Sequence, residues 1–177
     1  MKEDVGIVYD LIREDPDRGL YIGGNFNLTR EEFINFLLST DYGTKSLPTL
    51  IEAKNKIVGI AIINNISIFN LSAQFRILAV KKEYRKFGYG VYAAMILGAF
   101  LFGELKLNKV YTGKWDHNPN MDEIYKSAGL KLEGIDRENV RINGKWIDRQ
   151  RWGLLRGEIS EKLEKIFQRI MNENKIT

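Results

Sequence analysis

The sequence predicts an α+β protein built around one mixed, mostly antiparallel sheet with flanking helices. The hydrophobic pattern alternates between helical and strand periods, in the order helices, antiparallel meander, helix, strand, helix, long hairpin and helix. A strand that starts near Phe75 runs through a basic, glycine-containing turn into an almost wholly apolar helix that reaches Phe102. Further along, Asn143-Gly144 separates two strand-like segments, and this dipeptide is typical of a two-residue hairpin turn.

Length and composition favour one globular domain. The chain has 177 residues, 44% of them hydrophobic, which suffices for a sizeable core. It has no cysteine and one histidine, His117, so the sequence excludes disulfides and thiolate sites and predicts no metal site. The formal charge of +4 suits a polyanionic small ligand. The first residues do not resemble a signal peptide, and the apolar run 91–102 is too short to span a bilayer, so we expect a cytoplasmic protein.

Two amphipathic helices are expected before the first strand. In the first helix, four apolar residues recur at helical spacing: Val5, Val8, Tyr9 and Ile12. This helix ends near Pro16, because proline disfavours helical geometry in the residue before it. Thr29 and Glu32 form a capping box that starts the second helix. The apolar side chains that should face the core from this helix are Phe33, Phe36 and Leu37.

Short β-branched segments predict the strands. The expected strands are Leu50–Ala53, Ile57–Ile63, Ile66–Phe69 and Gln74–Val80, followed after a helix by Lys109–Lys114. Asn64-Asn65, between the second and third segments, predicts a bulge or a turn. The segments 130–141 and 145–155 form the late hairpin.

Three helices are expected among and after these strands. The central helix runs from Val91 to about Leu105 and is apolar on nearly all sides, so we expect it to be buried against the sheet. The next helix starts at Asn118-Pro119 and stops at Gly129, an expected left-handed cap. Ser160 caps the last helix, whose single apolar stripe suits its own domain or a homodimer interface. We therefore expect a domain of residues 1–158 followed by a C-terminal helix in residues 159–177.

The turn Arg85-Lys86-Phe87-Gly88-Tyr89-Gly90 is suited to hold phosphate. The first amides of a helix have no internal partner, and the helix dipole adds partial positive charge at the same end. Gly88 and Gly90 have no Cβ, so phosphates could approach the backbone closely. A turn packed for purely structural reasons remains an alternative. A Walker motif is excluded because Val91 follows Gly90, and a dinucleotide fingerprint fits less well because the next strand ends in Lys-Trp-Asp.

Two segments, in the right order, resemble the GNAT superfamily of N-acetyltransferases. Arg85-x-x-Gly88-x-Gly90 resembles the acyl-CoA signature of that family. Asn118, Tyr125 and Gly129-Leu130 resemble its second motif. The late hairpin is similar to that of the subgroup of ribosomal-protein N-terminal acetyltransferases and spermidine acetyltransferases. The matching positions there are Glu133, Gly134, Arg137, Gly144, Asp148, Gly153, Leu154, Leu155 and Glu158.

The resemblance implies a GNAT-like sheet in which two neighbouring strands splay apart around acyl-CoA. It also implies transfer of an acetyl group from acetyl-CoA to a primary amine by direct attack in a ternary complex. Backbone groups of Leu78, Ala79 and Val80 would bind the pantetheine amides. The amides of residues 85–90 would hold the pyrophosphate, and Asn118 would cap its helix and contact the pantetheine arm.

Such a transfer needs two proton carriers. A primary amine with a pKa near 10 is only about one part in a thousand neutral at pH 7, so a base or a chain of waters must deprotonate it. His117 titrates near neutrality and is the candidate base, with Asp116 and Glu133 as alternatives, although it also suits a plain surface loop. Tyr125 holds the motif position that would contact the cofactor and protonate the leaving thiolate, unless it only packs its helix onto the sheet.

Three departures from the family pattern matter. The chain opens on a helix, so the first strand of the family is expected to be missing. Met121 stands where the second motif usually has Ala or Ser, which would reshape the channel for the pantetheine arm. The strand before the turn carries Gln74 and Arg76 where many members carry a glutamate.

The acceptor remains open at this point. In this fold, acceptor specificity usually comes from segments that correspond to residues 15–27 and 139–145, and these contain no acidic cluster of the kind that a polyamine favours. A small-molecule amine or a peptide N-terminus would fit. A non-catalytic acyl-CoA-binding or regulatory module is the second hypothesis, supported by the missing glutamate. A nucleic-acid-binding domain is the third, but a basic helix face and an aromatic platform are lacking, so we expect no nucleic-acid partner.

Overall fold

Six strands form one sheet in a computed structural model of the chain, in the order β1-β2-β3-β4-β6-β5. The structure describes residues 6–7, 9–10, 12–13, 28–38, 47–80, 82–85, 88–115, 120–142 and 144–173. The strands are Leu47–Ala53 (β1), Lys56–Ser67 (β2), Ser72–Val80 (β3), Lys109–Trp115 (β4), Lys131–Ile142 (β5) and Lys145–Leu155 (β6). Neighbouring strands are antiparallel except β3 and β4, which are parallel. The predicted mixed, mostly antiparallel sheet is therefore confirmed.

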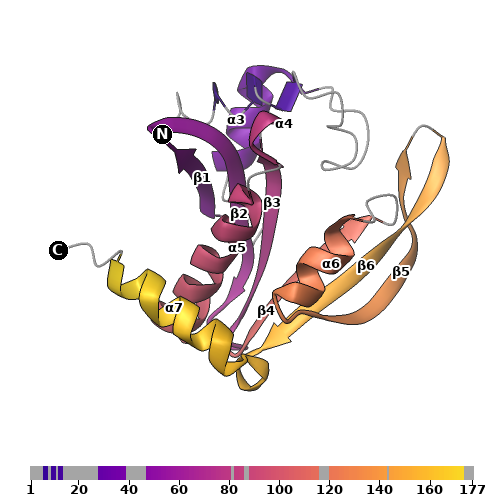
Figure 1. Ribbon diagram of the computed structural model, residues 1–177. Helices are drawn as coiled ribbons and strands as arrows, with labels where there is room; N and C mark the ends of the chain where they lie inside the picture. The colour runs from indigo at the N-terminus through magenta and orange to yellow at the C-terminus, as the bar shows by residue number, and fades with distance from the viewer. Residues whose placement is uncertain are drawn as a thin grey trace.

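Helices cover the sheet and connect its strands. They are α3 (Arg30–Leu38), α4 (Lys82–Arg85), α5 (Tyr89–Ala99), α6 (Asn120–Ser127) and α7 (Glu161–Glu173), with a π-helix η1 (Phe100–Glu104) and a 3-10 turn η2 (Arg156–Glu158). Figure 1 shows two diverging arms, one made of β1, β2, β3 and α5 and the other of β4, β5, β6 and α6, with α7 packed at their base. Within the described ranges, no helix is long and apolar enough to cross a membrane.

The local signals for helix ends are present as predicted. The Thr29 N–H donates to Glu32 Oε2 at 2.7 Å, and the Glu32 N–H donates to Thr29 Oγ1 at 3.2 Å, which completes the capping box. The backbone hydrogen bond from Thr29 lowers the pKa of Glu32. Gly129 has a φ of 83°, as expected of a left-handed cap, and Ser160 Oγ accepts the Leu163 N–H at 3.3 Å.

Two strand predictions need correction. β1 begins at Leu47 rather than Leu50, and the two segments expected on either side of Asn64-Asn65 form one strand, β2, with an irregularity at Asn65 (φ 52°). Of the segment 66–69, Ile66 and Ser67 extend the sheet as the end of β2, but Ile68 and Phe69 do not. Ser67 pairs with Ser72, so the residues between them must turn, and Ile68 and Phe69 are 78% and 97% exposed. Alternating apolar residues do not reveal where a hairpin closes.

The main core cluster lies between the sheet and α5, α6 and α7, a side that we call the helix face. Phe33 of α3 and Ile60 and Ile62 of β2 are buried outside this cluster. A Cβ added at Gly98 of α5 would lie 2.9 Å from Phe167 of α7, so these two helices pack closely.

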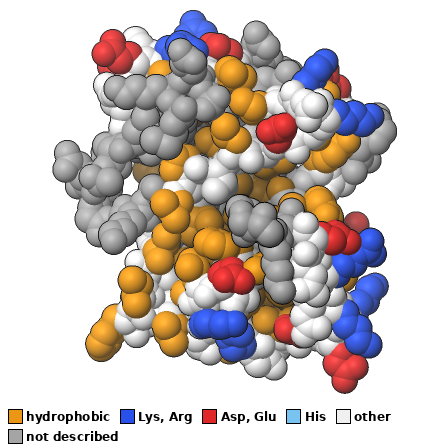
Figure 2. Space-filling model, turned by 90° about the vertical axis from the view of Figure 1, so that its left-hand side faces the viewer, with side chains coloured by type: hydrophobic (Ala, Val, Ile, Leu, Met, Phe, Trp, Pro, Cys, Tyr) orange, Lys and Arg blue, Asp and Glu red, His pale blue; other side chains and the backbone are white. Residues whose placement is uncertain are grey.

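The central helix is buried against the sheet as expected, through Ala93, Leu97 and Ala99, but Tyr92 and Ile96 are 50% and 37% exposed. The sheet and α7 cover two sides of α5 and leave a third uncovered in the described structure. Figure 2 shows hydrophobic side chains gathered on the side where β1, α5 and α7 lie.

Candidate functional site

The candidate site lies where β3 and β4 part. These parallel strands pair at three positions only, Ser72 with Lys109, Ala73 with Val110 and Gln74 with Tyr111. Beyond them, β3 continues to residue 80 and β4 to residue 115 without pairing with each other. We call the three paired positions the closed end, and residues 75–80 and 112–115 the fork. The divergence of the two strands is visible in Figure 1.

A bulge in β3 lies within the fork. Ile60 of β2 pairs with Ala79 and Ala61 pairs with Ile77, so Leu78 has no counterpart on β2. An extra residue on one strand bends that strand and increases its local twist. Because pairing with β4 already ends at Gln74, the bulge alters the course of β3 inside the fork and does not start the divergence. The splayed strands that the sequence predicted are confirmed.

The N-terminus of α5 has the backbone form of an anion site. Gly88 caps the helix with a φ of 74°, and the first helical hydrogen bond runs from the Tyr92 N–H to the Gly88 oxygen at 2.9 Å. The amides of Gly90 and Val91 precede that bond and have no helical acceptor. A Cβ added at Gly88 would meet no atom within 4 Å, so the turn is open at this glycine. Arg85 ends α4 just before this turn, while Lys86 and Phe87 lie outside the described residues.

Tyr125 of α6 lies on the helix face beside β4. Only 8% of the residue is exposed, and its ring centroid is 5.6 Å from that of Trp152 on β6. Burial raises the pKa of the Tyr125 phenol, and this outweighs a side-chain hydrogen bond with Thr112 that lowers the pKa. The phenol therefore keeps its proton at neutral pH, as a proton donor must.

Two arginines act on the same phenol from across the fork. The charges of Arg149 and Arg76 both favour the phenolate and lower the pKa of Tyr125, although less than burial raises it. Burial, followed by the charge of Arg149, lowers the pKa of Arg76 itself. These mutual effects mean that the three side chains share one electrostatic environment.

A buried ion pair that the sequence analysis missed holds α6 to β4. Lys114 is 5% exposed, and its Nζ lies 2.9 Å from Asp122 Oδ1. Lys114 follows Val110 and Thr112 on the alternating, buried side of β4, and a charge at such a position was the available signal. The pair ties the first turn of α6 to β4, one turn before Tyr125.

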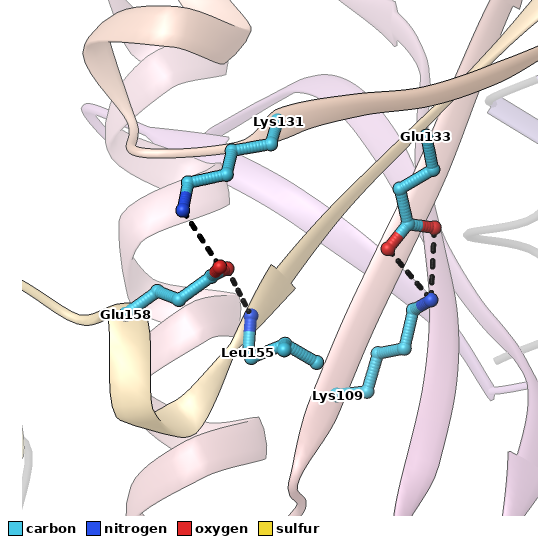
Figure 3. A network of polar contacts seen from close by, with 5 residues as sticks. All are labelled: Lys109, Lys131, Glu133, Leu155 and Glu158. Atoms are coloured by element: carbon cyan, nitrogen blue, oxygen red, sulfur yellow. Dashed lines mark hydrogen bonds and ion pairs between the residues drawn. The ribbon is translucent and has the colours of Figure 1, made fainter.

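The structure describes one of the three candidate bases. His117, Asp116 and the pantetheine candidate Asn118 lie outside the described residues. Glu133 lies at the closed end, where its Oε1 is 2.7 Å from Lys109 Nζ, away from Tyr125. Figure 3 shows this pair beside a second one, in which Lys131 Nζ is 2.7 Å from Glu158 Oε1. Glu133 thus forms an ion pair at the closed end and is a poor candidate for the base.

Gln74 and two unpaired polar atoms complete the surroundings. Gln74, at the last paired position, is 3% exposed and its Oε1 accepts a hydrogen bond from Asn65 Nδ2 at 3.1 Å. Asn64 Oδ1 and Trp115 Nε1 are buried without a hydrogen-bond partner. A separate pocket of about 350 Å³ lies between η1 and α7, at the end of α5 away from Gly88. That pocket is remote from the fork.

Comparison with known proteins agrees with this geometry. A spermidine N-acetyltransferase from Vibrio cholerae, crystallised with CoA and spermine, superposes with a TM-score of 0.78 at 19% identity over 89% of this chain and 93% of that one. The fold is an acetyltransferase fold. The crystal structure of a probable acetyltransferase superposes with a TM-score of 0.76 at 22% identity, over 89% of this chain and 90% of that one.

Sequence comparison gives a shorter match. The probable N-acetyltransferase YjcK of Bacillus subtilis is 38% identical over 58 residues. This match spans 33% of the chain and 32% of YjcK, so the chain covers about a third of the length of that relative. The sequence matches no protein-family model.

Proposed function

We propose that the protein is a GNAT-type N-acetyltransferase that moves an acetyl group from acetyl-CoA to a primary amine by direct attack in a ternary complex. The observation that carries this proposal is the fork between β3 and β4 with the buried, protonated Tyr125 beside it. The acetyltransferase fold and the match to YjcK support it.

The residues that would hold the cofactor are backbone groups on two elements. The diphosphate of CoA would lie against the amides of Gly90 and Val91, in front of Gly88, and the pantetheine arm would run along Leu78–Val80. CoA supplies an acetyl thioester, which is reactive toward amines and leaves a thiol. Met121 is partly buried against the core. Its flexible side chain would shape the channel.

The protein itself would manage the protons. Tyr125 would donate its hydroxyl proton toward the leaving sulfur, with the Thr112 side chain orienting the hydroxyl. His117 remains our candidate for the base that deprotonates the amine, directly or through water. The carboxylates of Asp122 and Glu133 are engaged by lysines, which supports a base outside the described residues.

The acceptor class follows from the neighbours only in outline. Spermidine acetyltransferases among the similar structures support a small-molecule amine as acceptor. A peptide N-terminus, as in the ribosomal-protein subgroup, is the other acceptor that we consider. A panel of amines with both types, assayed for thiol release from acetyl-CoA, separates them.

A non-catalytic acyl-CoA-binding module is the second candidate function. It is favoured by the strand leading into the fork, where Gln74 and Arg76 stand in place of a carboxylate. Calorimetry with CoA, followed by the thiol-release assay, distinguishes the two functions. We expect both CoA binding and amine-dependent thiol release. Tight CoA binding with no amine-dependent release across the panel would favour the module instead.

A further inference from the structure

Arg76 and Arg149 lie on the face of the sheet opposite the helix face. On β3, Phe75 belongs to the core under α5, and side chains alternate along a strand, so Arg76 points to the other face. On β6, Trp152 belongs to the same core, so Arg149, three residues before it, also points to the other face. Both arginines are half-buried.

The register brings the two arginines to the two edges of the fork. Gln74 and Tyr111 form the last pair, and Arg76 and Gly113 each lie two residues beyond it, at the same height. A Cβ added at Gly113 would lie 2.7 Å from Arg149 Nε, so the Arg149 side chain lies across β4 at that glycine. One guanidinium therefore borders the fork from β3 and the other borders it from β4.

Nothing in the described structure neutralises these charges. No carboxylate of the described residues forms an ion pair with Arg76 or Arg149. Asp136, which is opposite Arg149 in the sheet, instead binds Arg151, with its Oδ1 3.1 Å from Arg151 Nε. Trp115 adjoins Gly113 on the same face and leaves a buried indole N–H without an acceptor. Two like charges held together and an unpaired donor all favour a bound anion.

We propose that Arg76 and Arg149 bind a carboxylate or phosphate carried by the acceptor, so that the acceptor is a small anionic amine. A guanidinium presents two parallel N–H groups that match the oxygens of either group. This inference rests on the proposed acetyl transfer and names its acceptor class. The amides proposed to bind the CoA diphosphate are at the start of α5, on the helix face. The arginines therefore lie on the opposite side of the sheet from that diphosphate.

A polyamine fits this site poorly. Its ammonium groups would approach two guanidinium groups without an intervening carboxylate, and like charges at such distances repel. The chain thus shares its fold with a spermidine acetyltransferase, but its two arginines favour an anionic ligand over a cationic one.

The test uses pairs of amines that differ only in the anionic group. β-Alanine is compared with propylamine, and phosphoethanolamine with ethanolamine, so that the carboxylate and the phosphate are examined separately. The full chain is first shown by calorimetry to bind CoA. Amine binding to the CoA-saturated protein and kcat/KM for thiol release from acetyl-CoA are then measured for each pair. The variants are Arg76→Gln, Arg149→Gln and the control Arg151→Gln, whose arginine lies on the same strand and face as Arg149 but is paired.

We expect at least one anionic amine to exceed its neutral-tailed partner by about tenfold or more in kcat/KM, the effect of one charged hydrogen bond. Arg76→Gln and Arg149→Gln should abolish that preference, whereas Arg151→Gln should keep it. Arg76→Glu should raise the ratio of spermidine to phosphoethanolamine turnover. Equal use of both members of each pair, binding of neither member, or a preference that survives both substitutions would overturn the inference. A protein that binds no CoA would instead refute the proposed function.

Discussion

The charged side chains at the two ends of the junction between β3 and β4 differ in whether they have a partner of opposite charge. At the closed end, Lys109 is paired with Glu133, and nearby Lys131 is paired with Glu158. At the fork, the charge of Arg149 lowers the pKa of Arg76, both arginines lower the pKa of Tyr125, and neither has a carboxylate partner in the described structure. Charged side chains that serve only the fold are generally paired or solvated.

This difference indicates a structural role for the closed end and a functional role for the fork. An arrangement that lowers the pKa of an arginine costs stability, and such arrangements concentrate at functional sites. The closed end carries exposed pairs of the kind that contributes little to stability. The same two strands thus supply a structural end and a reactive end, and the boundary between them is the last pair, Gln74 with Tyr111.

The largest expected effect comes from Tyr125→Phe at the fork. Removing the hydroxyl removes the proposed acid but keeps the ring that packs on Trp152, so turnover should fall by at least about tenfold. CoA affinity should remain nearly unchanged. Thiol-release kinetics and calorimetry measure the two quantities. Turnover equal to that of the wild type would show that the acid is a different group.

The next prediction compares Gly88, at the proposed site of the CoA diphosphate, with Gly144, a glycine of similar conformation far from that site in the sequence. Gly88 and Gly144 have φ angles of 74° and 81°, and an added Cβ at either would meet no atom within 4 Å. Gly88→Ala and Gly144→Ala should therefore destabilise the protein similarly, by about 1 kcal/mol. Only Gly88→Ala should weaken CoA binding, by about fivefold or more, because its methyl group occupies the space before the amides of α5. Equal CoA affinities in the two variants would argue against a CoA diphosphate site at the start of α5.

Alkaline titration tests the environment of Tyr125. Burial raises its pKa in the folded protein, so between the ordinary value of about 10 and the raised value the folded state holds a proton that the unfolded chain has released. The stabilisation is complete below pH 10 and is lost as the pH rises through the folded pKa. Denaturant unfolding of the wild type and of Tyr125→Phe at several alkaline pH values should show the steeper loss in the wild type. Parallel curves would contradict the assigned burial.

The smallest expected effects are the changes in unfolding free energy when charges are removed at the fork and at the closed end. Arg76→Met keeps much of the side-chain volume and removes a charge repelled by Arg149, so the unfolding free energy should stay the same or rise by up to about 1 kcal/mol. A double-mutant cycle of Lys109→Met and Glu133→Gln should give a coupling energy below about 1 kcal/mol, since both side chains are 34% exposed. Strong destabilisation by Arg76→Met would assign that arginine a structural role.

The sequence predicted the features that depend on neighbouring residues. The capping box of Thr29 and Glu32 and the left-handed Gly129 each rest on short-range geometry, and both are present. The order of patterns was enough to predict the sheet. The spacing of Arg85, Gly88 and Gly90 identified the turn before α5, whose cap has the positive φ that suits glycine.

The remaining features depend on strand register and on what covers each surface. Arg76 was noted in the sequence only as a departure, because its relation to Arg149 needs the β4–β6 pairing and the bare Gly113 between them. The exposure of Tyr92 and Ile96 was not predicted, because an apolar helix gives no sign of how many neighbours it has. The bulge at Leu78 is likewise invisible in an alternating strand pattern.

Amide hydrogen exchange with and without CoA shows directly whether the fork binds the cofactor. We expect CoA to slow exchange in residues 76–80 of β3, 88–92 of α5 and 112–115 of β4, while the hairpin around Gly144 keeps its rate. Protection confined to the pocket between η1 and α7, or no protection at all, would contradict the claim that the fork is where this protein works.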